Sequence, residues 1–248
     1  MIIYWNMYVG ESDVDHVRIK NYSGLRVYPP EPVRDILPSA YNVQGKKDVA
    51  TCAYPLCPAF KDYNHNLFAI KSPIDYGINI GPRNETVTST SYDQKMFDDL
   101  VTVRSLPEKL FSMSIGLDLF TESKSLLISQ ESATFHSNGF VDNTIIIPGK
   151  FDLGKWVRPL EIGFHVKGNN MQMKDLDVLY YLRLHTSEKI TFKQFIPSPR
   201  YVELKGRILN TKNMKSKFSP LSYYYEIFAK QPNLKKMLFN EIKDNIVD

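Results

Sequence analysis

Three segments in the second half of the chain decide the fold: LEIGFHV at 160–166, VLYYLRL at 178–184 and KITFKQFI at 189–196. In the first segment the apolar side chains of Ile162, Phe164 and Val166 alternate with other residues, and the third segment repeats this pattern. The middle segment is a short, strongly apolar run. Both patterns are typical of strands when they are rich in aromatic and β-branched residues. We predict that the three segments form one antiparallel meander.

The chain before these segments carries the same signals. Apolar residues alternate from Phe111 to Leu119, and TIIIP at 144–148 is a β-branched run that ends in proline. The 248 residues include 15 Tyr, 14 Phe and 15 Pro but only 12 Gly, a composition that suits short strands joined by turns. We therefore predict a mainly β protein. Residues 1–200 should form one antiparallel β-sandwich or jelly-roll-like domain, whose first 50 residues are irregular and rich in proline.

The sequence becomes helical in pattern near its end. Leu234, Leu238 and Ile242 fall at helical spacing with lysines between them. A proline stands just before each candidate helix, which is its usual place at a helix start. We predict two short helices, which begin near Leu221 and near Asn233.

These helices would belong to a basic C-terminal extension over residues 201–248. From Glu203 to Asp248 there are nine Lys or Arg residues against five acids, so the extension carries the net charge of +4 and the rest of the chain is neutral. A partner attracted by charge should therefore meet the extension, although solvated helix faces show the same pattern. We also expect that removal of the residues after Pro220 leaves the β domain folded.

Lysines of this extension alternate with aromatic residues, which predicts contacts with nucleic acid as one alternative. Ammonium groups would contact phosphates and rings would stack on bases. The candidate residues for phosphate contact are Lys212, Lys215, Lys217, Lys235 and Lys236.

The cysteine content and the N-terminal segment indicate the compartment. The chain has only two cysteines, Cys52 and Cys57, which is too few for a disulfide framework and fits a reducing compartment. The opening MIIYWNMYVGE lacks both the charged and the apolar region of a signal peptide. No stretch approaches the roughly 18 apolar residues of a membrane-spanning helix. We expect a cytoplasmic protein without a membrane partner.

Cys52 and Cys57 are also candidate metal ligands, with His65 nearby. Structural zinc sites usually have two paired knuckles and four ligands, and no second cysteine pair occurs in this chain. A cysteine in an apolar, proline-rich segment usually serves as a small hydrophobe. We expect no cofactor here, with zinc as the alternative.

A second candidate metal set consists of His136, His165 and His185, with Asp142 and Glu161 as carboxylates. A non-haem iron oxygenase needs two histidines and one carboxylate on a β barrel, with open positions for oxygen and co-substrate. The chain has no His-x-Asp or His-x-Glu pair to open such a motif. Iron is therefore the alternative, and surface histidines are the simpler interpretation.

The segment KFDLGKWVRP, at 150–159, holds a candidate ligand site. On a strand Trp156 and Arg158 share a face, and Asp152 is close in the sequence. This set would bind a planar ligand by cation–π contact, or it would serve as structural packing under an Arg–Asp pair. The common nucleotide-binding and hydrolase motifs, such as G-x-G-x-x-G and G-x-S-x-G, are missing from the sequence.

Four segments resemble a group of uncharacterised all-β proteins of tailed bacteriophages, especially marine ones: CPAFKDY at 57–63, FAIKSPIDY at 68–76, IPGKFDLGKWVRP at 147–159 and DLDVLYYLRLHTSEKITFKQF at 175–195. The resemblance covers about residues 29–201. It implies a viral protein in the cytoplasm of the host cell or in the virion, and it carries no activity.

The sequence leaves three functions open. The first is a non-catalytic binding or virion-associated component, whose partners are other phage proteins or further copies of itself. The second is a metal-dependent oxygenase or cupin-like enzyme. The third is a nucleic-acid-binding accessory protein that acts through the basic extension.

Overall fold

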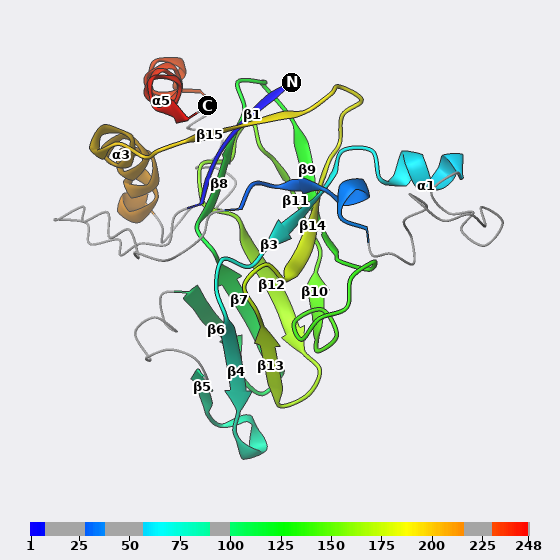
Figure 1. Ribbon diagram of the computed structural model, residues 1–248. Helices are drawn as coiled ribbons and strands as arrows, with labels where there is room; N and C mark the ends of the chain where they lie inside the picture. Colours follow the sequence, from blue (N-terminus) through cyan, green and yellow to red (C-terminus); the bar gives the residue numbers. More distant parts are fainter. Residues whose placement is uncertain (8–27, 38–56, 90–99, 216–229, 248) are drawn as a thin grey trace.

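The computed structural model describes residues 1–7, 28–37, 57–89, 100–215 and 230–247, and for residues 210–215 it describes the backbone alone. This part of the chain is mainly β and largely antiparallel, as predicted. Figure 1 shows the strands as the body of the molecule and the two long helices together on one flank. No helix among these residues is both long and apolar enough to cross a membrane.

The first sheet lies against the C-terminal helices. In spatial order its strands are β16 (Ile246–Val247), β15 (Thr191–Phe195), β1 (Ile2–Met7) and β8 (Leu117–Phe120). β1 pairs in parallel with β15 and antiparallel with β8. One face of this sheet carries Tyr4, Phe120 and Phe195 toward the helices, and the other carries Ile3 and Trp5 into the main core.

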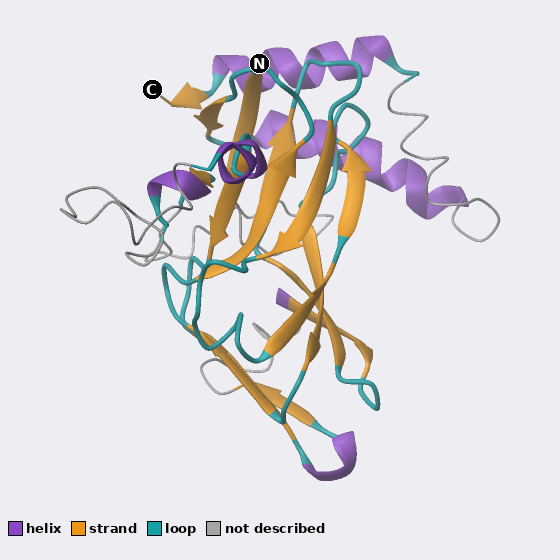
Figure 2. Ribbon diagram, turned by 90° about the vertical axis from the view of Figure 1, so that its right-hand side faces the viewer, coloured by secondary structure: helices purple, strands orange, loops and turns teal. Residues whose placement is uncertain are grey.

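Three further sheets enclose the main core. The second has the order β10 (Thr144–Ile147), β12 (Glu161–Val166), β7 (Leu110–Ser114) and β6 (Val101–Ser105). The third has the order β11 (Gly149–Asp152), β9 (Leu127–Ser132), β14 (Val178–Leu184), β3 (Leu67–Lys71) and β2 (Glu31–Pro32). The fourth has the order β13 (Asn170–Met173), β4 (Tyr76–Ile80) and β5 (Val87–Ser89). In Figure 2 the strands run from the end with the C-terminal helices to the β4–β5 hairpin at the other end.

Several runs of the chain pass from one sheet to another. The predicted alternating run from Phe111 is divided at Gly116, whose φ of 70° bends the chain so that β7 joins the second sheet and β8 the first. Pro148, which has no N–H to donate, divides β10 in the second sheet from β11 in the third. These bends join the sheets around one core.

The predicted meander of the three closing segments is wrong, although each segment does form a strand. β12 pairs with β10 and β7, β14 pairs with β9 and β3, and β15 pairs with β1 and β16. Alternation of side chains indicates a strand and its buried face, but it does not identify the neighbouring strand. Only the pairing of β12 with β10 joins strands close in the chain, and the other partners of the three strands come from distant parts.

The C-terminal helices are α3 (Pro199–Lys215) and α5 (Pro232–Asp244). The helix predicted from about Asn233 is confirmed as α5, whereas α3 was not predicted, and Leu221 lies outside the described residues. Both helices pack on the first sheet through one apolar cluster. Its helical members are Tyr201, Leu204, Ile208, Leu238, Phe239 and Ile242.

The remaining helical elements are short: α1 (Pro58–Tyr63) and the 3-10 helices η1 (Val33–Asp35) and η4 (Pro82–Asn84). α1 and η1 lie near the outer face of the third sheet. There a small second core forms around Leu67, Ala69 and Tyr181.

Candidate anion-binding cleft

A cleft of about 480 Å³ lies where α5 passes the β8–β9 turn and the turn after β11. Lysines line it from two of these elements: Lys124 from the β8–β9 turn, and Lys235 and Lys236 from α5. The rest of the lining consists of Glu122, Gly154, Pro232, Phe239 and Asn240. The cleft therefore brings together three lysines and one carboxylate from segments more than a hundred residues apart.

The position of α5 follows from its apolar face. The Phe239 ring lies among aromatic residues of the first sheet, with its centroid 6.0 Å from that of Tyr4 and 6.4 Å from that of Phe120. Pro232 begins the helix, and its first turn contains no acidic residue. Lys235 and Lys236 thus stand at the positive end of the helix dipole, where cations are unfavourable and anions are favoured.

Lys235 is the most enclosed of the three lysines. Its Nζ donates to the carbonyl oxygen of Gly154 at 2.9 Å and lies 5.8 Å from the centroid of the Phe239 ring. Burial lowers the pKa of Lys235, while the carboxylates of Asp152 and Glu122 act in the opposite direction. Lys124 and Lys236 are exposed.

Asp152 shapes the turn that holds Gly154. Its carboxylate accepts hydrogen bonds from the Leu126 amide at 2.9 Å, the Gly154 amide at 3.0 Å and the Ser125 hydroxyl at 2.8 Å. Burial alone would raise the pKa of Asp152, but these hydrogen bonds outweigh it and lower the pKa. The carboxylate of Asp152 is therefore ionised, and its oxygens are hydrogen-bonded to groups of the turn.

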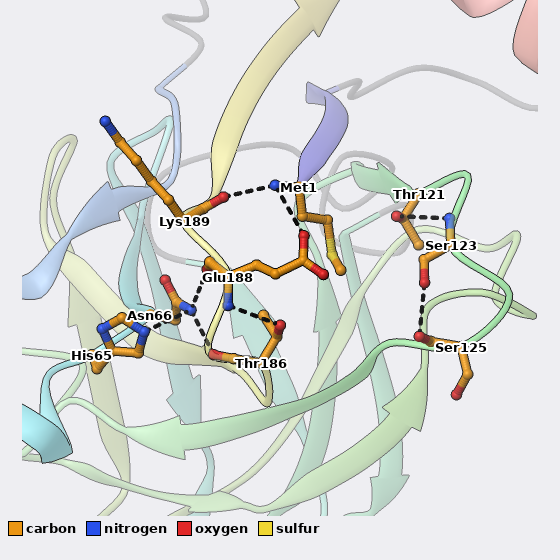
Figure 3. A network of polar contacts seen from close by, with 9 residues as sticks. All are labelled: Met1, His65, Asn66, Thr121, Ser123, Ser125, Thr186, Glu188 and Lys189. Atoms are coloured by element: carbon orange, nitrogen blue, oxygen red, sulfur yellow. Dashed lines mark hydrogen bonds and ion pairs between the residues drawn. The ribbon is translucent and has the colours of Figure 1, made fainter.

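Gly154 allows the two turns to meet. A Cβ at this position would lie 2.4 Å from the carbonyl oxygen of Lys124, a distance that real Cβ atoms do not adopt. The β8–β9 turn is held by its own contacts: the Ser123 amide donates to the Thr121 hydroxyl at 3.2 Å, and the Ser123 hydroxyl donates to the Ser125 carbonyl at 2.9 Å (Figure 3). Lys124 is thus presented from a fixed backbone.

The acids near the cleft are also engaged. Glu122 accepts from Lys243 at 2.7 Å and from the Tyr4 hydroxyl at 3.3 Å. Lys243 lies two turns beyond Lys236 on α5, and its ion pair with Glu122 occupies one oxygen of the carboxylate that lines the cleft.

The side chains of Trp156 and Arg158 contact other parts of the protein than Asp152 does. The Trp156 ring stacks on Phe151, with centroids 4.7 Å apart and planes at 26°, and packs against the main core. Arg158 acts electrostatically on Glu161, which lies on β12. Asp152 therefore ends β11 and bonds to its turn, Trp156 packs against the core, and Arg158 lies in the loop before β12, so the strand on which Trp156 and Arg158 were predicted to share a face is absent from the described residues 156–160.

The candidate metal ligands do not converge among the described residues, where no group of three or more His, Cys, Asp or Glu side chains is placed to hold a metal ion. Nε2 of His136 donates to the Ile36 carbonyl at 3.2 Å, so its Nδ1 accepts from the Tyr181 hydroxyl at 2.6 Å. Burial lowers the pKa of His136, which favours this neutral form. His185 follows Tyr181 by four residues, about 13 Å along an extended strand.

The other predicted ligands are scattered as well. His165 lies on β12 in the second sheet, and Glu161 of that strand bonds to Arg104 at 2.5 Å. Asp142 accepts from the Ser137 hydroxyl at 2.6 Å. Cys57 is exposed beside α1, and Cys52 lies outside the described residues.

Ser129 and His185 form a contact whose polarity is unsuited to nucleophilic catalysis. The Ser129 hydroxyl donates to Glu131 at 3.1 Å, so its oxygen accepts from His185 Nε2 at 3.0 Å. A serine nucleophile needs the opposite arrangement, in which the histidine accepts the hydroxyl proton. Glu131 is held by Arg183, at 2.5 and 2.8 Å, and this pair lowers the pKa of Glu131 against the effect of burial.

A further polar network, drawn in Figure 3, ties β1 and β3 to the β14–β15 loop. The Asn66 amide donates to the carbonyls of Thr186 at 2.7 Å and Glu188 at 2.9 Å, from a backbone with a φ of 51°. The amino group of Met1 donates to the Lys189 carbonyl at 2.7 Å. These donors bond to backbone carbonyls, so the network organises the loop.

Among the five lysines predicted to contact nucleic acid, Lys235 and Lys236 line the cleft. Lys217 and the side chains of Lys212 and Lys215 lie outside the described structure. Sequence reasoning missed Lys124 and Gly154, because only the folded chain brings their two turns to α5. Comparison with protein-family models, with curated proteins and with solved structures finds no match for this chain.

Proposed function

We propose that this protein is a non-catalytic binding component that holds an anionic, phosphate-class group in the α5 cleft. The observation that carries the proposal is the convergence of Lys124, Lys235 and Lys236 on one cleft at the positive end of a helix. Ammonium groups are common ligands of phosphate. Of the two carboxylates that act on Lys235, Glu122 is paired with Lys243 and Asp152 is hydrogen-bonded to its own turn.

The size of the cleft favours a ligand larger than a bare ion. About 480 Å³ is within the range of small-molecule sites, and Phe239 supplies an apolar wall. A small molecule with a terminal phosphate fits these features. The phage origin that the sequence resemblance implies stays a prediction, as do the host cytoplasm or virion as its location.

Titration calorimetry with inorganic phosphate at low ionic strength tests this proposal. We expect one site per chain, with an affinity that falls about tenfold when Lys236→Gln removes one charge-assisted contact. Lys189→Gln is the matched control, because it removes the same charge from an exposed position outside the cleft. Equal binding by wild type and a Lys124→Gln, Lys235→Gln, Lys236→Gln variant would refute the cleft as the site.

The nucleic-acid alternative uses Lys235 and Lys236 as well, and salt dependence separates it from a small anion. A single phosphate group releases few counterions, whereas a strand bound along the extension releases one for each phosphate contacted. Fluorescence anisotropy with a labelled single strand, measured over a range of salt concentrations, gives the number of counterions released on binding. A steep salt slope that Lys236→Gln reduces by about one would favour nucleic acid as the ligand.

A further inference from the structure

Lys235 differs from the other lysines of the cleft in being held in one place. Its side chain is partly buried, whereas those of Lys124 and Lys236 are exposed. The 2.9 Å hydrogen bond to the Gly154 carbonyl and the nearby Phe239 ring orient its nitrogen. An amine that is fixed beside an anion site is held at a constant position relative to a ligand whose anionic group is bound there. Such fixed positioning of two reacting groups accelerates their reaction.

The charges around Lys235 come from three elements. Asp152 faces it from the end of β11 and Glu122 from the β8–β9 turn, and both favour its ammonium form. Lys124 and Lys236 line the same cleft. Burial has the largest effect and lowers the pKa of Lys235, so its neutral amine is more populated than that of an exposed lysine. The neutral amine is the nucleophilic form.

We propose that Lys235 is a nucleophilic amine that condenses with an aldehyde whose anionic group is bound by Lys124 and Lys236. This inference rests on the proposed function, since the anion site brings the carbonyl carbon to the amine.

The reaction needs no further reactant. The Lys235 nitrogen attacks the carbonyl carbon to form a C–N bond, and the electron pair of the C=O bond moves to oxygen, which takes up a proton. The resulting carbinolamine loses water, and the products are one imine and one water molecule from one amine and one aldehyde. No oxidation state changes. The protonated imine keeps a positive charge near the anion of the ligand.

Reductive trapping tests the inference with a matched pair of probes, pyridoxal 5′-phosphate and pyridoxal. Each is incubated with the full chain, reduced with borohydride, and mapped by peptide mass spectrometry. We expect the phosphorylated probe to modify Lys235 in preference to the other lysines, and pyridoxal to label lysines according to exposure. Inorganic phosphate should compete with the labelling of Lys235 by the phosphorylated probe.

Three variants sharpen the result. Lys236→Gln should lower the labelling of Lys235 by about tenfold, through loss of one charge-assisted contact. Lys235→Arg keeps a positive charge but forms no imine, so the selective adduct should disappear. Lys189→Gln, outside the cleft, should leave the labelling of Lys235 unchanged.

Failure of the inference is distinguishable from failure of the proposed function. Labelling spread over exposed lysines, or equal selectivity for both probes, would overturn the inference. If calorimetry still shows phosphate bound in the cleft, the proposed function stands. Absence of phosphate binding in calorimetry, together with unselective labelling, would overturn both.

Discussion

The buried ion pair between Asp118 of β8 and Lys205 of α3 tests how the C-terminal helices are attached. The Asp118 side chain is 1% exposed and that of Lys205 is 13% exposed. Oδ2 of Asp118 accepts from the Tyr201 hydroxyl at 2.9 Å and from Lys205 Nζ. Removal of one partner of a buried pair leaves an uncompensated charge, at a cost of about 3–5 kcal/mol. We expect Lys205→Met to lower the free energy of unfolding by that amount.

Urea denaturation gives this free energy by linear extrapolation. A triple variant, Asp118→Leu, Tyr201→Phe and Lys205→Met, removes the desolvation cost together with the pair and should lie within about 2 kcal/mol of wild type. Arg207→Gln, on the exposed side of α3, is the control and should leave the midpoint unchanged. A Lys205→Met midpoint equal to that of wild type would show that this pair does not attach α3.

The sequence led us to expect that the β domain folds without the residues after Pro220, but α5 supplies three buried side chains to the cluster on the first sheet. Removal of residues 232–248 should therefore abolish the cooperative thermal transition or lower its midpoint strongly. Circular dichroism melting measures this, and an unchanged melt would support the independent β domain that the sequence suggested. Gly154→Ala should reduce both stability and phosphate affinity, since its Cβ would collide with the Lys124 carbonyl; unchanged values in urea denaturation and calorimetry would contradict the described turn. The affinity for sulfate, which does not titrate near neutral pH, should fall as pH rises through the lowered pKa of Lys235, because the cation is lost there. This decline in affinity should therefore begin at a lower pH than it would for a lysine with the ordinary pKa of 10.5. A sulfate affinity that calorimetry finds constant up to pH 10.5 would refute the prediction.

The sequence was informative about strands and uninformative about their partners. The alternation of Ile162, Phe164 and Val166 correctly indicates β12 and its buried face. The pairing of β15 with β1 joins residues nearly two hundred positions apart, and no local pattern encodes it. The predicted meander assumed that consecutive strands are neighbours, which is only a tendency.

Of the two C-terminal helices, the sequence predicted one and not the other. α5 was predicted because Leu234, Leu238 and Ile242 repeat at helical spacing, and two of these side chains are indeed fully buried. α3 was not predicted, because helices were expected only from about Leu221 and about Asn233. Pro199 nevertheless occupies the first position of α3, which is a usual place for proline at a helix start.

The candidate cleft was only half visible in the sequence. Lys235 and Lys236 stand out in a basic extension, but the same lysines would suit a solvated helix face. Lys124 and Gly154 carry no motif, and they become significant only when α5 docks beside their turns. The predicted histidine cluster does not form among the described residues, because His136 bonds to Tyr181 of the third sheet whereas His165 lies on β12 of the second sheet.

Docking of α5 links the cleft to the fold. Phe239 is at once a wall of the cleft and a buried member of the cluster on the first sheet, so the cleft exists only when α5 is packed. A ligand that binds this state alone must stabilise the protein, by about 2.7 kcal/mol at a free concentration one hundred times its dissociation constant. The melting temperature should therefore rise with phosphate concentration in wild type and in Lys189→Gln. It should rise much less in the Lys124→Gln, Lys235→Gln, Lys236→Gln variant, and an equal rise in all three proteins would place the anion outside the cleft.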